Sequence, residues 1–306
     1  MTESGLNYNA PSSIRAFLDT HGLSMQKKFG QNFLINEGAR GRIVEALGVG
    51  AGDAVWEIGP GLGSMTRLLL DRGAEVKVFE IDHGFIGALN DLFAKEIAAK
   101  QLVIAAGDVL KTWPSHAAEA GERPLYLLGN LPYNIAGMLL ADFIENGRFF
   151  SRAVVTVQKE VAVRIMAQSG DRDYASLAVL FAEVYETRKI CAMKGPFFYP
   201  PPNVDSTAFC FFPKEHAAPA VPPVFFPLVR ALFAQKRKTV YNNLCRFAGN
   251  SVLSGVLCDD VPAFCETALF ECAIEKNTRA ENLKPADFRN LAAFLTKHGH
   301  GFRGGF

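Results

Sequence analysis

The chain has 306 residues, of which 49% are hydrophobic, and this is enough for one large domain with its own core and a smaller second one. Its formal net charge of +1 excludes a globally basic protein, so binding of any nucleic acid would depend on local patches. No apolar run approaches the ~20 residues of a membrane helix, and the amino-terminal segment lacks the apolar core of a signal peptide. We therefore expect a cytoplasmic protein that does not bind membranes.

Strand and helix patterns alternate from residue 54 onward, which predicts a parallel sheet with helices on both faces. The candidate strands are 54–58, 75–80, 102–106, 125–128, 153–157, 177–185 and 207–212. A proline-rich stretch without a helix separates the last two, so we expect these to be antiparallel to each other. The predicted fold class is α/β, with a Rossmann-like seven-stranded sheet of the methyltransferase type, its last strand antiparallel.

The strand pattern stops after residue 213. Residues 214–223, rich in proline and alanine, are typical of a linker, and helical patterns follow over 227–246, 261–272 and 285–297. We therefore predict an α/β domain over 1–213 and a small all-helical domain over 214–306. Their formal net charges are −3 and +4, so the carboxy-terminal domain is the basic one.

The six cysteines give no indication of a metal site. They form no Cys-x-x-Cys pair and have no histidine at metal-ligand spacing, so we expect reduced thiols and no bound metal. Cys258, Cys265 and Cys272 recur every seven residues, and we interpret them as a structural stripe on a helix.

The first predicted strand leads directly into the glycine-rich turn Gly59-Pro60-Gly61-Leu62-Gly63. Glycines let the backbone turn tightly and approach a ligand closely. The dinucleotide fingerprint is G-x-G-x-x-G, whereas the spacing here is G-x-G-x-G, and Pro60 removes an amide that could hold a phosphate. The turn therefore favours a cofactor with an amino-acid tail over one with a pyrophosphate.

Carboxylates end the next two predicted strands. Glu80 ends the second strand, where it could accept both ribose hydroxyl protons, and Asp108 follows the third, where it could accept from an adenine amino group. Each alone is more typical of a strand end or a helix cap than of a ligand-binding residue. Their succession after adjacent strands favours a ligand site, because open α/β sheets bind ligands beyond the carboxyl ends of their strands.

The fourth predicted strand leads into the most specific motif, Asn130-Leu131-Pro132-Tyr133. An exocyclic amine of adenine is a poor nucleophile, so a catalyst must accept its N–H bonds and direct its lone pair. The Asn130 oxygen and a nearby backbone carbonyl, such as that of Leu131, could do this without a strong general base. Pro132 would stiffen the turn, and Tyr133 could stack on the base. The alternative is a turn that closes a strand, with Tyr133 packed in the core.

These motifs and others along nearly the whole chain resemble the ribosomal RNA adenine dimethyltransferase family, whose members modify two adjacent adenines near the 3′ end of small-subunit ribosomal RNA. The matching segments are 27–34 (KKFGQNFL), 57–63 (EIGPGLG), 107–108 (GD), 130–133 (NLPY), 158–162 (QKEVA), 200–206 (PPPNVDS) and 279–283 (RAENL). The sequence departs from the family at 174–178, which is Tyr-Ala-Ser-Leu-Ala where relatives carry Tyr-Gly-x-Leu-Ser.

The resemblance implies an enzyme that transfers methyl groups from S-adenosylmethionine to 16S ribosomal RNA, two on each adenine, with the assembling 30S subunit as partner. Residues 1–213 would be its methyltransferase domain and 214–306 its RNA-binding domain. The resemblance assigns cofactor contacts to Asn32 and Leu34 at the methionine end, Gly59 and Gly61 in the turn, Glu80 at the ribose, Asp108 at the adenine, and Asn130, which also serves the target. We expect a monomer.

Two basic groups are candidates for binding RNA phosphates. The first is Lys236-Arg237-Lys238 in the first helix of the small domain, where the family carries Arg-Arg-Lys. The second is Lys27 and Lys28, with Arg40 and Arg42 nearby. Successive cations on a helix do not share one face, so a solvated surface is the alternative interpretation.

Other functions remain open at this point. Related enzymes that methylate large-subunit ribosomal RNA and protect against macrolides tend to carry Asn-Ile-Pro-Tyr and lack the 200–206 segment. DNA adenine methyltransferases share the amine chemistry but typically carry a second proline in this motif and a target-recognition domain. A non-catalytic ribosome-assembly or RNA-binding factor would not need Asn130, and the glycine spacing disfavours a dehydrogenase.

Overall fold

The computed structural model describes residues 6–25, 31–119, 121, 123–214, 222–250 and 260–299. Its contacts divide the chain into two units. The first unit is Met1–Ala162 with Glu186–Pro213, and the second is Val163–Tyr185 with Lys214–Phe306. The chain thus passes into the second unit twice, once at residue 163 and again at residue 214.

A seven-stranded mixed sheet forms the centre of the first unit. Its strands are β2 (Ala54–Ile58), β3 (Glu75–Glu80), β4 (Leu102–Ala106), β5 (Leu125–Asn130), β6 (Arg152–Gln158), β7 (Tyr185–Met193) and β9 (Ser206–Pro213), in the spatial order β4-β3-β2-β5-β6-β9-β7. Strands β2 to β6 pair in parallel, and β9 pairs antiparallel with β6. The predicted fold class is confirmed.

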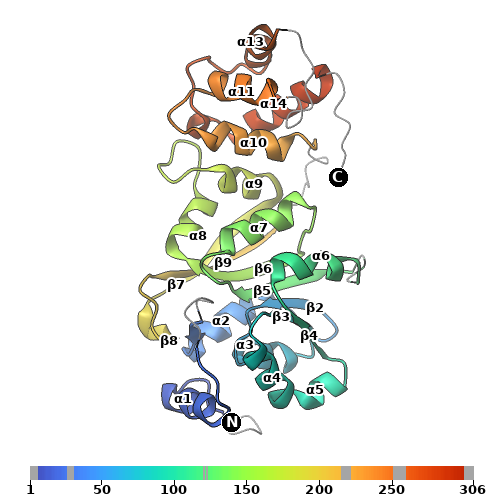
Figure 1. Cartoon of the computed structure of the whole chain (residues 1–306), viewed down its shortest axis with the longest axis vertical. Coiled ribbons are helices and arrows are strands. Elements are labelled where there is room, and N and C mark those ends of the chain that lie inside the picture. Colours follow the sequence, from blue (N-terminus) through green and yellow to red (C-terminus); the bar gives the residue numbers. More distant parts are fainter. Residues whose placement is uncertain are drawn as a thin grey trace. The chain divides into compact units, whose positions relative to one another are not determined.

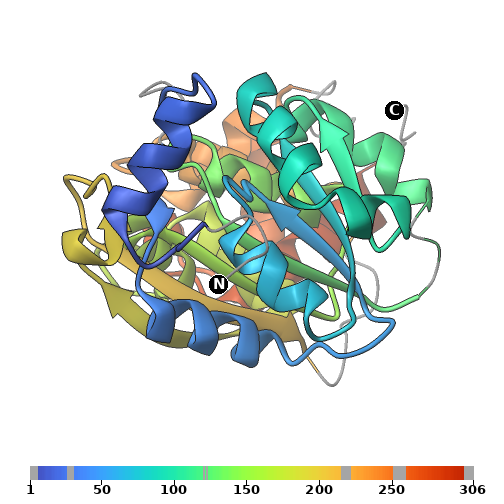
Figure 2. The ribbon, with the colours of Figure 1, turned by 90° about the horizontal axis from the view of Figure 1, so that it is seen from below.

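Helices connect and cover these strands. They are α2 (Glu37–Leu47), α3 (Ser64–Leu70), α4 (His83–Leu92), α5 (Ala94–Ala98), α6 (Val109–Glu119) and α7 (Ala136–Glu145). Helix α1 (Pro11–Thr20) precedes the sheet, and α8 (Lys159–Met166) begins in the first unit and ends in the second. Helix α2 packs against β5, β6 and β9, and Figure 2 shows it lying along the sheet. All five residues of β2 are buried, including the acidic Glu57, as expected for a parallel strand covered on both faces.

One predicted strand is wrong. Residues 177–185 form most of α9 (Ser176–Val184), and the seventh strand begins only at Tyr185. The segment is an apolar run interrupted only by Glu183, with Ala178 to Phe181 all buried, and such a run lacks the periodicity that separates a buried strand from a buried helix. The strand β7 was missed because exposed charged residues, including Arg188 and Lys189, interrupt its apolar pattern.

The second unit is helical (Figure 1). Helices α9, α10 (Phe225–Ala234), α11 (Val240–Ala248), α13 (Val261–Glu271) and α14 (Pro285–His298) belong to it, and α10 packs against α9, α11 and α14. The two helices predicted last along the chain are confirmed to within a residue at either end. The one predicted over 227–246 is two helices, because Thr239 caps the start of α11 through the N–H of Asn242.

The predicted linker and the cysteines can be compared with the structure only in part. Most of the predicted linker and Cys258 lie outside the described residues. Among the residues that the structure describes, no helix is long and apolar enough to cross a membrane. No group of three or more His, Cys, Asp or Glu side chains is placed among them to hold a metal ion. Cys191, Cys210 and Cys265 are buried free thiols.

Candidate active site

A cavity of about 330 Å³ lies where the carboxyl ends of β2, β3, β4 and β5 meet. All the residues predicted to hold a cofactor line it: Asn32, Leu34, Gly59, Gly61, Glu80, Asp108 and Asn130. Pro132 of the predicted acceptor motif also lines it, whereas Leu131 and Tyr133 do not. The structure thus brings together in one cavity residues that are spread over about a hundred positions of the sequence.

The glycine turn lies directly against the acceptor loop that follows β5. Gly59 has a φ of 68°, and a Cβ there would stand 3.3 Å from the carbonyl oxygen of Asn130. Gly61 has a φ of 58°, and its Cβ would stand 3.0 Å from the ring of Phe33. Glycine is required at both positions because the backbone is left-handed and the neighbouring groups are close. The two loops that the predicted chemistry needs therefore face each other.

The segment 31–34 closes another side of the cavity, and long-range contacts hold it there. Strand β1 (Phe33–Leu34) pairs antiparallel with β8 (Phe198–Tyr199). The guanidinium of Arg40 is buried, donates to the Leu34 carbonyl at 2.6 Å, and also bonds the side chain of Asn9. Arg40 is therefore a structural anchor, and its placement in an RNA-facing basic group was wrong.

Two acidic side chains are buried beside the glycine turn. Glu57 is completely buried, and its Oε2 accepts from the Thr66 hydroxyl at 2.6 Å. Burial raises the pKa of Glu57 to about 7. Glu80 accepts from the N–H groups of Ile81 and Asp82, each at 2.9 Å, yet burial also raises its pKa to about 7. Of these two carboxyls only Glu80 lines the cavity, where it suits a ligand that donates hydrogen bonds to it.

Asp108 combines two roles that its sequence position left open. Its Oδ1 accepts from the Leu110 N–H at 3.1 Å, which caps the start of α6. The same half-buried residue lines the cavity, next to Gly107. The structural interpretation and the ligand-binding interpretation are therefore compatible.

The Asn130 side chain presents an acceptor with no partner. Its Nδ2 donates to the Asn32 carbonyl at 2.9 Å, which fixes the orientation of the amide. Its Oδ1 is buried, and nothing in the described part of the chain donates to it. A buried acceptor without a donor is costly, by about 1–3 kcal/mol, unless a ligand supplies one. The site thus fits a ligand that brings an N–H group to this atom.

The other two residues of the motif are held from the side of β6 and β9. Leu131 is buried, and its N–H donates to the Thr156 carbonyl at 3.0 Å. Tyr133 is half-buried, and its hydroxyl shares a 2.6 Å hydrogen bond with the Ser206 hydroxyl. The ring of Tyr133 is therefore not sealed in the core, and it lies in sequence between Pro132 and Asn134, which both line the cavity.

Sequence reasoning missed the apolar wall of the cavity. Ile81 and Val109 line it, each directly after an acidic residue at a strand end, and Phe85, Met65 and Ile135 line it as well. An apolar residue directly after an acidic residue at a strand end could have predicted a site that binds the flat ring of a ligand. The contact between Tyr133 and Ser206 left no such local signal.

The predicted RNA-binding residues lie elsewhere or are not described. Lys27 and Lys28 lie outside the described residues. Lys236, Arg237 and Lys238 are exposed in the second unit, but they occupy the loop between α10 and α11. Their placement in a helix was wrong, and the objection that a helix would spread them over different faces no longer applies.

Comparisons with known proteins identify relatives that match most of the chain. A family model described as Ribosomal RNA adenine dimethylase matches residues 22–297. The chain is 40% identical over 290 residues to the ribosomal RNA small subunit methyltransferase A of Treponema denticola, which covers 94% of this chain and 96% of the relative. It is also similar to a crystal structure of a dimethyladenosine transferase from Plasmodium falciparum, with a TM-score of 0.70, 28% identity, and coverage of 87% of this chain and 98% of that one.

A second solved structure, the 23S rRNA methyltransferase ErmE, has a TM-score of 0.60 at 22% identity and covers 87% of this chain and 100% of its own. At that identity the likeness is one of fold alone. The family model, in contrast, spans most of the chain, and the relative from Treponema denticola matches over nearly its full length. The chain therefore belongs to the ribosomal RNA adenine dimethylase family.

Proposed function

We propose that this protein is the S-adenosylmethionine-dependent enzyme that dimethylates two adjacent adenines near the 3′ end of small-subunit ribosomal RNA during ribosome biogenesis. Family membership supports methylation of ribosomal RNA adenine, and the relative from Treponema denticola is named for the small subunit. The observation that carries the proposal is the buried Oδ1 of Asn130, to which no described residue donates, on a residue whose backbone carbonyl lies beside the glycine turn.

S-adenosylmethionine supplies a methyl group on a positively charged sulfur, which makes that carbon an electrophile. The cavity offers suitable contacts for each part of this cofactor. Glu80 can accept from ribose hydroxyls, Asp108 can accept from the adenine amino group, and Asn32 with the glycine turn can hold the methionine end. The apolar side chains of Ile81 and Val109 can pack on the adenine ring.

On the acceptor side, Asn130 would orient the target amine. With Nδ2 already engaged by Asn32, its Oδ1 can accept one N–H of the adenine amine, and a neighbouring carbonyl, such as that of Leu131, can accept the other. This arrangement directs the nitrogen lone pair toward the methyl group. No general base is needed, because the methylated amine is acidic and loses its proton to water. Tyr133 would stack on the flipped-out base.

The RNA would extend beyond this cavity, and we assign its phosphates to two basic groups. One is the exposed loop that carries Lys236, Arg237 and Lys238, and the other is Lys27 with Lys28. Under this proposal residues 1–213 act as the methyltransferase domain and residues 214–306 as the RNA-binding domain. The partner is the assembling 30S subunit, and the enzyme works as a monomer.

A large-subunit enzyme of the macrolide-resistance type is the second candidate. It shares the fold, since ErmE resembles this chain at 22% identity, but the relatives with greater identity are named for the small subunit. A non-catalytic assembly factor is disfavoured by the intact Asn130, because such a factor would gain nothing from an unsatisfied buried acceptor.

The proposal is tested by incubating undermethylated small and large ribosomal subunits with the protein and isotope-labelled S-adenosylmethionine, followed by mass spectrometry of RNA fragments. We expect label as dimethyladenine at two adjacent positions near the 3′ end of the small-subunit RNA. Label confined to large-subunit RNA would support the second candidate, and label on cytosine, or none on RNA, would refute both.

A further inference from the structure

The hydrogen bond between Tyr133 and Ser206 joins two segments that the proposed chemistry treats separately. Ser206 is fully buried and is the first residue of β9, opposite Gln158 in the antiparallel pair with β6. Its hydroxyl lies 2.6 Å from the hydroxyl of Tyr133, and 73 positions of sequence separate the two residues. Ser206 also ends the 200–206 segment, to which the cofactor and acceptor sites assign no task.

This bond is the second of two tethers on the acceptor loop. The first is the N–H of Leu131, which donates to the Thr156 carbonyl on β6 at 3.0 Å. The two tethers fix the loop on either side of Pro132, one through the backbone and the other through the end of an aromatic side chain. A ring fixed at its hydroxyl has less freedom to turn about its side-chain torsions, so its plane is set before a base arrives.

The bond also determines which part of Tyr133 a base can meet. The bond holds the phenolic hydroxyl against the first residue of β9 and occupies either its proton or one of its lone pairs, so the hydroxyl is less available to the edge of an adenine. The ring would therefore act through its face, which leaves the amine of the base to Asn130. Without Ser206, the hydroxyl of this half-buried tyrosine would need another partner, and the base edge is one candidate.

The segment of the chain that leads from β7 to Ser206 also supports the cofactor side of the cavity. This segment contains β8, whose Tyr199 pairs with Phe33 of β1, next to Asn32. Asn32 in turn accepts from the Asn130 side chain. One connecting segment thus contacts both the wall of the cofactor site, through β8, and the acceptor tyrosine, through Ser206.

We propose that Ser206 is a positioning residue for the reaction, which holds the ring of Tyr133 in the plane needed to stack on the target adenine. This inference rests on the proposed function and adds a residue to it. Positioning matters most in the second methyl transfer, because the base must then present an amine that already carries a methyl group. If the ring of Tyr133 turned freely, the enzyme would release more RNA that carries only one methyl group on the adenine.

The test is a double-mutant cycle on undermethylated small subunits with saturating cofactor, with Ser206→Ala, Tyr133→Phe and the double variant. Each single change removes the same hydrogen bond from opposite ends and keeps the aromatic ring. We expect each to lower kcat by about 5- to 20-fold, to leave the KM for S-adenosylmethionine within about twofold, and to raise the proportion of monomethyladenine. The double variant should be no worse than either single one.

Thr207→Val is the matched control, because Thr207 is the next residue of β9, is also buried, and loses a hydroxyl in the same way. It should retain the wild-type kcat and product ratio. Tyr133→Phe keeps the test valid if Ser206→Ala does not fold, since Tyr133 is half-buried and only its hydroxyl is removed.

Three results would overturn the inference: unchanged kcat and product ratio in both single variants, losses that multiply in the double variant, or an equal loss in Thr207→Val. Failure of the proposed function would look different, because the wild-type protein itself would then leave small-subunit RNA unmethylated.

Discussion

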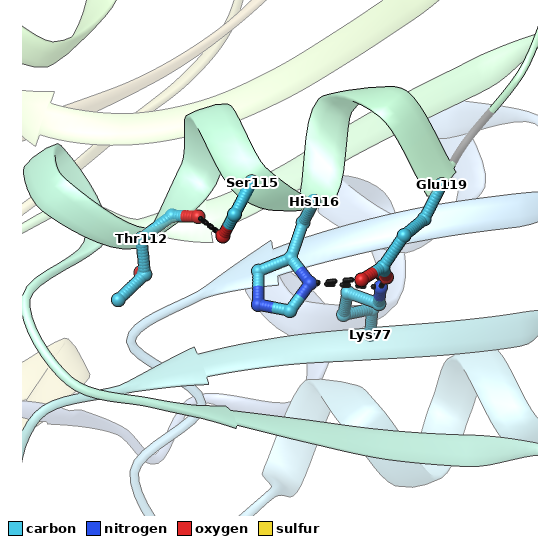
Figure 3. Close-up of polar contacts among 5 residues, drawn as sticks. All are labelled: Lys77, Thr112, Ser115, His116 and Glu119. Carbon is cyan, nitrogen blue, oxygen red and sulfur yellow. Dashed lines mark hydrogen bonds and ion pairs between the residues drawn. The ribbon is translucent and has the colours of Figure 1, made fainter.

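Two groups of ionisable side chains in the first unit show opposite electrostatic behaviour. On one face, Lys77 of β3 bonds Glu119 of α6, and His116 lies 3.1 Å from the same carboxylate (Figure 3). The Glu119 side chain is 57% exposed, and these partners lower its pKa to about 2. At the carboxyl ends of the strands, Glu57 and Glu80 are buried, and the pKa of each is raised to about 7.

The difference separates a structural cluster from a ligand site. Exposed charges that pair with one another satisfy themselves at little cost and contribute little. A buried carboxyl whose pKa is dominated by burial has been removed from water without full compensation, which is tolerated where a ligand completes the site. By this criterion we expect the chemistry near Glu80 and Asn130, which line the cavity, and we assign the cluster of Lys77, His116 and Glu119 to the fold.

The largest effect is expected at Asn130. Asn130→Ala removes the acceptor that would orient the target amine, so we expect kcat for methyl transfer to fall by about 10²- to 10³-fold. The rate is measured with labelled cofactor and undermethylated small subunits. Asn146→Ala is the control, since Asn146 is an exposed amide whose side chain donates to Asp142 at the end of the same helix. Retention of more than a tenth of the activity in Asn130→Ala would contradict the assignment.

The next effect concerns the cofactor. Glu80→Gln replaces a carboxylate that can accept two hydroxyl protons by an amide that can accept on one side only. We expect the Kd for S-adenosylmethionine to rise by about 10- to 100-fold in calorimetric titrations at pH 8.

The wild-type protein should bind the cofactor more weakly as the pH falls below 7, because protonation of Glu80 then competes with the hydroxyl donors. Glu80→Gln should lack this component of the pH dependence. Identical pH profiles for the two proteins would show that Glu80 does not hold the ribose.

A smaller effect is expected on stability at Glu57. Its folded-state pKa of about 7 lies above the ordinary value of 4.5, so its contribution to stability is full below pH 4.5 and is lost as the pH rises through 7. Glu57→Gln cannot ionise and should reduce the fall in unfolding free energy between pH 5 and pH 8 by about 1–3 kcal/mol. Denaturant unfolding at both pH values measures this. The exposed Glu45→Gln should leave the fall unchanged, and an equal change there would refute the argument.

The smallest effect is expected in the cluster of Figure 3. Glu119→Gln changes a carboxylate that is itself 57% exposed and remote from the cavity, so the midpoint of thermal unfolding should shift by about 1 °C or less, with the methylation rate unchanged. Because the pKa of Glu119 is about 2, the pair that it forms with Lys77 should persist from neutral pH down to about pH 4. A loss of methylation activity in Glu119→Gln would show that this cluster is not purely structural, in contrast to what its exposed ion pairs predict.

The part of the site that could be predicted from sequence is the part built at strand ends. The glycine turn, Glu80, Asp108 and Asn130 each follow a recognisable strand, and parallel strands bring their carboxyl ends to one edge. Contacts between segments far apart in the chain left no local pattern. The pairing of Phe33 with Tyr199 and the bond between Tyr133 and Ser206 are examples.

Local patterns also failed where burial was uniform or where a loop interrupted a helix. Residues 177–185 carry no period that distinguishes strand from helix, and the helix is settled only by the packing of α9 against α10 and α14. The break between α10 and α11 depends on Asn243, a buried side chain that donates to the carbonyls of Leu232 and Gln235. The Asn243 side chain thereby satisfies backbone carbonyls at the end of α10. The sequence pattern alone predicts that this helix continues.

The order of the strands has a consequence for how the protein is made. Strand β7 leaves the ribosome before β9, yet in the sheet β9 lies between β6 and β7. Until residue 213 has emerged, β7 has no neighbour in the sheet and β6 is paired only with β5, so the nascent chain exposes one unpaired strand and one open strand edge. Because Ser206 and the partner of β1 lie in this late-emerging stretch, the catalytic cavity would be among the last parts of the first unit to acquire its walls.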